Sequence, residues 1–438
     1  MRLFQRDDVM MYKIHYRGRH IVRLFIFFEW SGFFLAGLIF LCAQGLLSVQ
    51  PLNAAEQEIA AVFVPNPADP SHNKFVNTTP VSGYCQILPG QCENLNFSSI
   101  NFPVDFDASK GLDPDEALAD KRKAAYFLIP SGFRTVTITN DQTGESSQVQ
   151  WRISGFGGRY ILSSGTWHGH LWPSAWVNAA SPCTYGGVGS GNAFFFDYFW
   201  KVPQSATTAC VKMPKVEIPA PFIYRNMNIS YEMRTPNPLA MEMGTYSGSI
   251  TYGIGPGQDF DFGDIMVPSD DHITFNFKLS VNHFLNVEFP PGASRAVLQP
   301  EGGWQGWLNT GRLPPSLFAN HDFKVSSSGK FKVYLECQYV VEGTCGIRPL
   351  THEQPAVGVD IQLTLPAGIV VDSGGQPAHR VPLGRGENSA VVFSTQHIQF
   401  SRKATLHYVV PGVTTAAMLK HPGTTYTGGA TIIFDADI

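Results

Sequence analysis

Arginine side chains in the N-terminal half of the chain could bind an acidic ligand. A guanidinium group binds a carboxylate through two parallel hydrogen bonds, as recognition of an acidic sugar would require. Arg152, Arg225 and Arg234 are the candidate residues for binding such a ligand. The alternative interpretation is that each is an ordinary solvated arginine.

A second chemical candidate is the almost entirely aromatic run Phe194–Trp200. The favoured interpretation is a buried strand, and the alternative is a platform for glycans, because aromatic faces stack on sugars. His168 and His170 lie between Trp167 and Trp172, and in a strand they would face the same side. No third ligand is near in the sequence, so we predict no metal site.

The sequence shows few features that are typical of an enzyme. The acidic stretch 259–264 (DFDFGD) could bind calcium through its oxygens, but a solvated acidic linker is the favoured interpretation. No serine-hydrolase elbow, zinc-protease helix or phosphate loop occurs. The net charge of -4 does not suggest a nucleic-acid partner. We therefore predict a non-enzymatic protein without a cofactor.

The N-terminus predicts export. Arg17, Arg19 and Arg23 form a basic region, an apolar stretch follows over 33–49, and small residues stand at 52–55. This order is typical of a signal peptide, which we assign to residues 1–55. An uncleaved signal anchor is the alternative, and translation could begin at Met10 or Met11.

The number of cysteines also indicates an exported protein. Of the seven, Cys42 lies in the leader, and the remaining even set is typical of disulfides outside the cytoplasm. Their order along the chain suggests local pairs, although other connectivities stay open. The expected pairs are Cys85–Cys92, Cys183–Cys210 and Cys337–Cys345.

Alternation of apolar and polar residues predicts strands throughout, as in 135–139, 272–279 and 330–335. Gly (42) and Pro (31) are abundant, which favours short strands joined by turns. We expect an all-β protein of two immunoglobulin-like sandwiches in tandem. A glycine cluster predicts a linker over 254–263, between an N-terminal domain at 56–253 and a C-terminal domain at 264–438.

Two segments with similar sequences stand at the ends of the two expected domains. Gly244–Tyr252 and Thr425–Phe434 both read Thr-Tyr, a small hydroxyl residue, Gly and then a β-rich run. With the early cysteine pair, the later pair and the Ile218-Pro219-Ala220 step, the order of features resembles the tip subunits of class 5 fimbriae. That family includes the colonization factor tip adhesins and the cable-pilus initiator.

The resemblance implies a receptor-binding N-terminal domain and an incomplete, pilin-like C-terminal domain that lacks one strand. A periplasmic pilus chaperone would fill the gap first. At the outer-membrane usher, a major pilin subunit would then donate its N-terminal strand. The chain would pass through the periplasm to the fimbrial tip on the cell surface and bind a host glycan or glycoprotein.

The resemblance also assigns residues. Arg234 is the nearest counterpart of the family's arginine patch, although Asn237 and Pro238 stand where further arginines are expected. Alternate residues of the C-terminal domain's first and last strands would line the donor-strand groove, namely Phe275, Phe277, Ile432 and Phe434. The short run 59–64 ends at Pro65, so we expect a chain that accepts a strand and donates none.

Three other functions remain open at this point. The protein could be a structural pilus initiator that binds no receptor, a secreted carbohydrate-active β protein, or an assembly factor that does not enter the fibre. The pilin-like last strand argues against the assembly factor.

Overall fold

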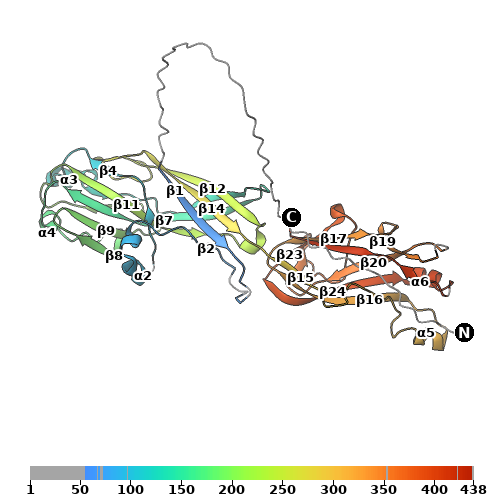
Figure 1. The fold of residues 1–438 in the computed structure, drawn as a ribbon. Helices are drawn as coiled ribbons and strands as arrows, with labels where there is room; N and C mark the ends of the chain where they lie inside the picture. The colour runs from blue at the N-terminus through green and yellow to red at the C-terminus, as the bar shows by residue number, and fades with distance from the viewer. Residues whose placement is uncertain are drawn as a thin grey trace, which may run out of the picture.

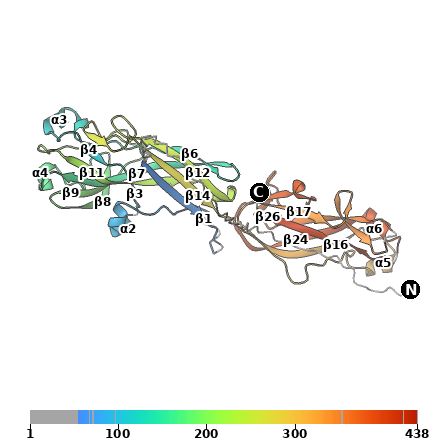
Figure 2. The ribbon, with the colours of Figure 1, turned by 45° about the horizontal axis from the view of Figure 1, so that its top comes forward.

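A computed structural model describes residues 55–66, 68–69, 73–95, 97–351, 354–421 and 423–436. The expected leader and its cleavage region lie outside these residues, apart from Ala55. Within the described residues, no helix has the length and apolar character needed to cross a membrane. The all-β, two-domain prediction is confirmed: strands dominate, and they form two bodies that follow one another along the chain (Figures 1 and 2).

The first domain is built from the strands that precede residue 282. These are β1 (Ala55–Phe63), β2 (Val76–Asn77), β3 (Ile100–Asn101), β4 (Phe106–Ala108), β5 (Ala125–Phe127), β6 (Arg134–Asn140), β7 (Ser146–Leu162), β8 (Thr184–Gly191), β9 (Phe195–Lys201), β10 (Cys210–Lys212), β11 (Phe222–Arg234), β12 (Gly244–Gly253), β13 (Met266–Pro268) and β14 (His272–Val281). Its short helical pieces are α1 (Tyr84–Ile87), α2 (Pro89–Leu95), α3 (Pro114–Ala119), η1 (Lys121–Lys123), α4 (His168–Leu171) and η2 (Pro238–Ala240).

The second domain is built from the elements that follow residue 284. Its strands are β15 (Leu285–Glu288), β16 (Ser316–Ser327), β17 (Phe331–Cys337), β18 (Val340–Val341), β19 (Thr344–Pro349), β20 (Val357–Thr364), β21 (Ile369–Val371), β22 (Val381–Pro382), β23 (Val391–Thr395), β24 (Gln399–Pro411), β25 (Tyr426–Thr427) and β26 (Ala430–Asp435). Its helical pieces are α5 (Gln305–Thr310), η3 (Glu387–Ser389) and α6 (Gly412–Met418).

The long strand β7 organises the first domain. Its N-terminal part pairs with β6, its C-terminal part pairs with β9, and β11 runs antiparallel beside it. Gly157 permits the close approach of β9, because a Cβ atom there would lie 2.2 Å from the carbonyl oxygen of Tyr198. The sheet then continues through β12 and β14 to β1, which is parallel to β14.

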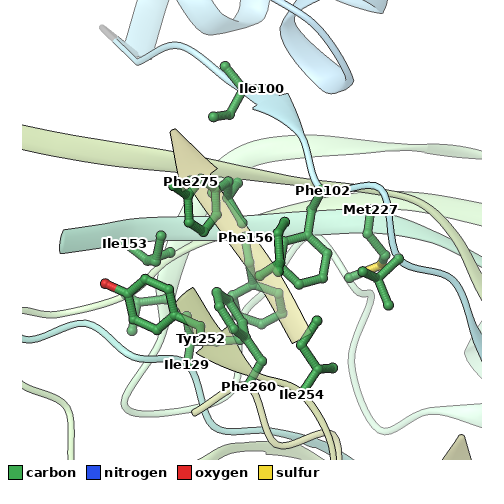
Figure 3. Close-up of a cluster of buried hydrophobic side chains, with 14 of the residues drawn as sticks. Ile100, Phe102, Ile129, Ile153, Phe156, Met227, Tyr252, Ile254, Phe260 and Phe275 are labelled. Atoms are coloured by element: carbon green, nitrogen blue, oxygen red, sulfur yellow. The ribbon is translucent and has the colours of Figure 1, made fainter. Parts of the chain in front are cut away.

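Aromatic side chains fill the core of this domain. Figure 3 shows Phe102, Phe156, Tyr252 and Phe275 gathered between the strands. Trp151 lies in the same cluster, fully buried, with its ring 5.3 Å from that of Phe275. Burial of such large apolar side chains is the dominant favourable contribution to folding.

The expected linker at 254–263 is wrong, because this segment is folded into the first domain. Ile254 and Phe260 are buried in its core (Figure 3). Asp261 is 1% exposed and accepts hydrogen bonds from the guanidinium of Arg122 at 2.8 and 3.1 Å. The glycines serve tight turns, since Gly257 and others there have positive φ. The stretch is therefore neither a linker nor a solvated acidic run.

The expected boundary moves with it. Strand β14, assigned in advance to the C-terminal domain, pairs with β12 on one side and with β1 on the other. Strand β15 is the first element of the second sheet system. The first domain therefore continues to Val281, and the chain passes between domains at 282–284.

The cysteines form the three local disulfides expected from their order. Cys85–Cys92 closes the turn around α1 and α2, Cys183–Cys210 links β10 to the residue before β8, and Cys337–Cys345 closes the β17 to β19 connection. Each pair lies inside one domain, as the sequence predicted.

The position of β14 gives a prediction about fragments. A fragment of residues 55–284 is expected to unfold cooperatively, whereas a fragment of 55–263 is expected to be largely unfolded or insoluble. The shorter fragment removes β14 from between β12 and β1, which leaves each of them with an unpaired edge and exposes the apolar faces that β14 covers. Circular dichroism during thermal unfolding measures this, and equal cooperativity of the two fragments would contradict the boundary.

Candidate functional site

The second domain is made of two facing sheets with one apolar core between them. One sheet runs β15-β16-β24-β20-β19-β18, and the other runs β21-β23-β17-β26. The core side chains come from alternate positions of these strands, for example Val333 and Leu335 on β17. This is the arrangement of a sandwich, in which inward and outward residues alternate along each strand.

Strand β26 lies at the edge of its sheet. It pairs antiparallel with β17, from Ala430 opposite Cys337 to Asp435 opposite Lys332. Among the described strands it has no partner on its other side. Ala430 and Ile432 point into the core, and Phe434 packs against the core while remaining partly exposed.

An apolar row faces the unpaired side of β26. Phe289, just after β15, stacks on Phe323 of β16 with ring centroids 4.7 Å apart. The ring of Phe323 lies 5.7 Å from that of Phe434. Val287 of β15 is also partly buried against the same core. We call Val287, Phe289, Phe323, Ile432 and Phe434 the open seam, because they lie where the two sheets end beside each other.

A hollow opens next to the seam. Its volume is about 480 Å³, and Phe289, Pro290 and Phe323 form its apolar wall. Its rim is charged, with Lys403 paired to Asp322 at 2.8 Å. Phe289 and Phe323 therefore belong both to the seam and to the wall of this hollow, whereas no described residue of β26 lines it.

Length distinguishes β26 from the other edge strands of this domain. Edge strands β15, β18 and β21 have between two and four residues, whereas β26 has six. Short edges, charges and prolines are the usual protection against unwanted strand pairing. The run from Ala430 to Phe434 carries no charge and no proline, so β26 is an edge suited to receive another strand.

The groove residues expected from the sequence divide between the domains. Ile432 and Phe434 lie at the open seam, in the last strand. Phe275 and Phe277 do not, because β14 belongs to the first domain, where both pack on Trp151. Sequence reasoning missed Phe289 and Phe323, since only the fold shows that β15 ends beside β16 at this point.

Two of the three candidate arginines are already occupied. Arg152 is 7% exposed and its guanidinium donates two hydrogen bonds to the carboxylate of Glu232. Arg225 donates to the carboxylate of Asp107 at 2.6 Å and to the carbonyl of Phe106 at 3.1 Å. Both side chains join neighbouring strands, which is a structural function.

Arg234 differs from them. Its guanidinium lies 4.0 Å from the centroid of the Phe133 ring, and its polar contact with Gln150 is long, at 3.5 Å. Among the described residues, no carboxylate forms an ion pair with it. Of the three candidates, Arg234 therefore best retains the capacity to bind an external carboxylate.

The histidines lie in a different setting from the one considered in the sequence. His168 and His170 belong to the short helix α4, not to a strand. His168 donates through Nε2 to the carbonyl oxygen of Asn192, so its Nδ1 accepts from the hydroxyl of Tyr160. Both ring nitrogens of His168 are engaged in holding this end of the domain together.

A buried lysine fixes the loop that follows α4. The ammonium of Lys212, in a residue only 4% exposed, donates to Ser174 Oγ and to the carbonyl oxygens of Ala175 and Asn178 at 2.8 to 2.9 Å. Burial lowers the pKa of Lys212 to about 8. The acceptors are neutral, so the charge is held by dipoles alone.

Comparison with known proteins gives remote structural matches only. No family model and no curated protein matches the chain. A tip adhesin solved in a chaperone complex of CFA/I fimbriae has 10% identity, covers 87% of this chain and 96% of its own, and has a TM-score of 0.24. CfaE, the adhesive subunit of CFA/I fimbria of enterotoxigenic Escherichia coli, has 8% identity, 87% and 99% coverage, and a TM-score of 0.23.

The CsuC–CsuE chaperone–tip subunit complex of Acinetobacter baumannii Csu pili is a further match. It has 8% identity, 87% and 98% coverage, and a TM-score of 0.19. TM-scores this low do not establish a common fold.

The arginine assignments can be tested by stability. Arg152→Met is expected to destabilise the first domain by about 2 kcal/mol, because it leaves buried hydrogen-bond acceptors such as the Val202 carbonyl unpaired. Arg234→Met is expected to change the free energy of unfolding by less than about 0.5 kcal/mol. Urea denaturation measures both, and a larger loss for Arg234→Met would reverse the two roles.

Lys212 gives a pH-dependent prediction. Its pKa is about 8 when folded and 10.5 as the reference value, so between these pH values the unfolded state binds more protons. Stability from this group therefore rises with pH across that window, by no more than about 3 kcal/mol. The free energy of unfolding of the wild type minus that of Lys212→Met should rise from pH 8 to 10.5, and a falling difference would contradict the assignment.

Proposed function

We propose that this protein is a minor fimbrial subunit that works at the pilus tip. Its second domain accepts a donor strand at the open seam, and its first domain attaches to a host glycan or glycoprotein. The observation that carries the proposal is the apolar edge of β26 opposite Val287, Phe289 and Phe323. An extended segment inserted there would bond to β26 through its backbone and place alternate side chains on the seam.

The same geometry supports the proposed partners. A periplasmic chaperone would cover the seam before assembly, because an exposed apolar edge strand promotes aggregation. At the outer-membrane usher, the N-terminal strand of a major pilin would replace the chaperone. The chain would thus be exported through the periplasm to the fimbrial tip.

The N-terminal strand supports a subunit that receives a strand but does not donate one. Residues Ala55–Phe63 form β1, which is paired with β14 along its whole length and with β2 on its other side. Ile59 and Phe63 of this strand are fully buried in the first domain. A segment used in this way is not free to complete another subunit.

Two carboxylates of the first domain, those of Asp197 and Asp261, are paired with arginines. Asp197 accepts two hydrogen bonds from Arg159 at 2.8 and 2.9 Å. Burial opposes the ionisation of Asp261, but hydrogen bonds from Arg122, Gly257 and Gly263 outweigh it and hold its pKa below the usual value. A glycosidase acid needs a raised pKa and a second opposed carboxyl group, and these paired acids do not offer that arrangement.

A structural initiator that binds no receptor is the second candidate, and Arg234 separates it from an adhesin. An adhesin that uses the unpaired guanidinium would lose cell binding in Arg234→Ala while its melting temperature stays unchanged. Arg225→Ala is not a suitable control, because that side chain supports the strands. Gln150→Ala, which removes the neighbouring β7 side chain that Arg234 contacts but keeps the guanidinium, is the matched control.

Strand acceptance is tested by complementation of the chain from Ala55 onward. The N-terminal extension peptide of the major pilin produced with it is added while unfolding is followed by calorimetry. At about 100 times Kd the peptide should stabilise the second domain by about 2.7 kcal/mol, which raises its melting temperature by several degrees.

Phe434→Ser and Ile433→Ser form a matched pair for this experiment. They lie side by side on β26, but only Phe434 belongs to the seam. Peptide affinity should fall markedly in Phe434→Ser and much less in Ile433→Ser. A second domain whose melting temperature ignores the peptide would rule out strand acceptance.

A further inference from the structure

Two large aromatic side chains are exposed at the end of the first domain that carries α4, the end away from the second domain (Figures 1 and 2). Trp167 is 74% exposed and Phe194 is 54% exposed. The other tryptophans of this domain, Trp151, Trp172, Trp176 and Trp200, are buried. Most large aromatic side chains of this domain are buried in its core, so two exposed rings in neighbouring loops call for an explanation.

The loops that carry the rings are joined by backbone hydrogen bonds. Leu162 donates to the carbonyl of Phe194, and Thr166 donates to the carbonyl of Ala193, both at 2.8 Å. The ring of Phe194 lies against Gly165, where a Cβ atom would be 3.0 Å from it. Trp167 begins the turn into α4, and its carbonyl accepts from the amide of His170. Both rings are thus presented from one connected surface.

A rigid layer supports this surface from below. His168 links Asn192 in one loop to Tyr160 on β7 through its two ring nitrogens. Tyr160 is fully buried and packs on Trp176 with ring centroids 4.5 Å apart. The backbone of Lys215 also donates to the carbonyl of Leu171 at 2.7 Å. A surface fixed before binding loses little conformational entropy when a ligand arrives.

The surroundings are polar and include the exposed ammonium of Lys215, which donates to the carbonyl of Gly169 at 3.2 Å. Ser163, Ser164 and His170 are exposed beside the rings. The nearby Arg159 and Asp197 neutralise each other, with the guanidinium stacked 3.8 Å from the centroid of Phe195. These groups can exchange hydrogen bonds with the hydroxyl groups of a sugar, and because Asp197 neutralises Arg159, the cation left at this surface is Lys215.

Size separates a sugar from a protein partner. With about 250 and 200 Å² for the two side chains, their exposed fractions correspond to an apolar surface on the order of 300 Å². A stable protein interface covers about 800 Å² on each partner. The smaller area matches one or two sugar rings, whose C–H faces stack on aromatic rings while their hydroxyl groups bond to a polar rim.

We propose that Trp167 and Phe194 form a platform for neutral carbohydrate, in which a sugar ring stacks on the indole of Trp167. This inference rests on the proposed role of the first domain in attachment, and it names the ligand class and the residues. The platform is separate from Arg234, which lies at the C-terminal end of β11 beside Gln150.

The experiment measures binding of the purified chain, from Ala55 onward, to an array of immobilised glycans with neutral hexose or N-acetylhexosamine ends and to sialylated versions of them. The wild type should bind one or more neutral glycans. Trp167→Ala should lower the signal at least about tenfold, as loss of a stacked ring predicts. Phe194→Ala should lower it less, and Trp167→Tyr should retain part of it.

Controls exclude a folding defect. Because both rings are exposed, the melting temperatures of the variants should equal that of the wild type. Ile87→Ala removes another exposed apolar side chain, 60% exposed, from the same domain and should leave binding unchanged. Unchanged binding in Trp167→Ala, binding to sialylated glycans alone, or no glycan binding by the wild type would each overturn the platform.

The result is independent of strand acceptance. A chain that is stabilised by the pilin peptide but binds no neutral glycan overturns the platform and leaves the fimbrial role standing. A chain that binds neutral glycans through Trp167 but ignores the peptide retains the platform and loses the fimbrial role.

Discussion

The proposed function depends above all on the unpaired side of β26. A strand in a sheet presents its backbone donors and acceptors to both sides, and β17 meets those on one side of β26. The other side borders Phe289, Phe323 and Phe434, where water is a poor partner for apolar side chains and a strand is a good one. An incoming strand would satisfy the backbone and the seam together, which is the basis of the proposed strand acceptance.

The first domain differs in that its N-terminal strand already has partners on both sides. This strand lies between β14 and β2, the domain's buried Asp261 is paired with Arg122, and its long strands share one aromatic core. Its exposed features at the α4 end lie away from the second domain and are available for binding. Attachment at one domain and strand acceptance at the other would let the chain join a fibre to a surface without chemistry of its own.

Local pattern predicted much of this fold, and long-range pairing explains the errors. Alternation correctly identified β14 and β26, but it contains no information on which sheet a strand joins, so Phe275 and Phe277 were assigned to the wrong domain. The glycines near Gly257 predicted a break in structure, yet they serve turns around the buried Asp261. Arg152 and Glu232 are 80 positions apart, and only the fold brings them together.

Residue-resolved amide hydrogen exchange of β26, in the chain from Ala55 onward, tests the open edge most directly. With an open edge, amides that donate to β17 should exchange slowly, the intervening amides should exchange rapidly, and a bound pilin peptide should slow the intervening set. Equal and strong protection of every β26 amide in the chain alone would contradict an open edge, because the edge would then already be covered.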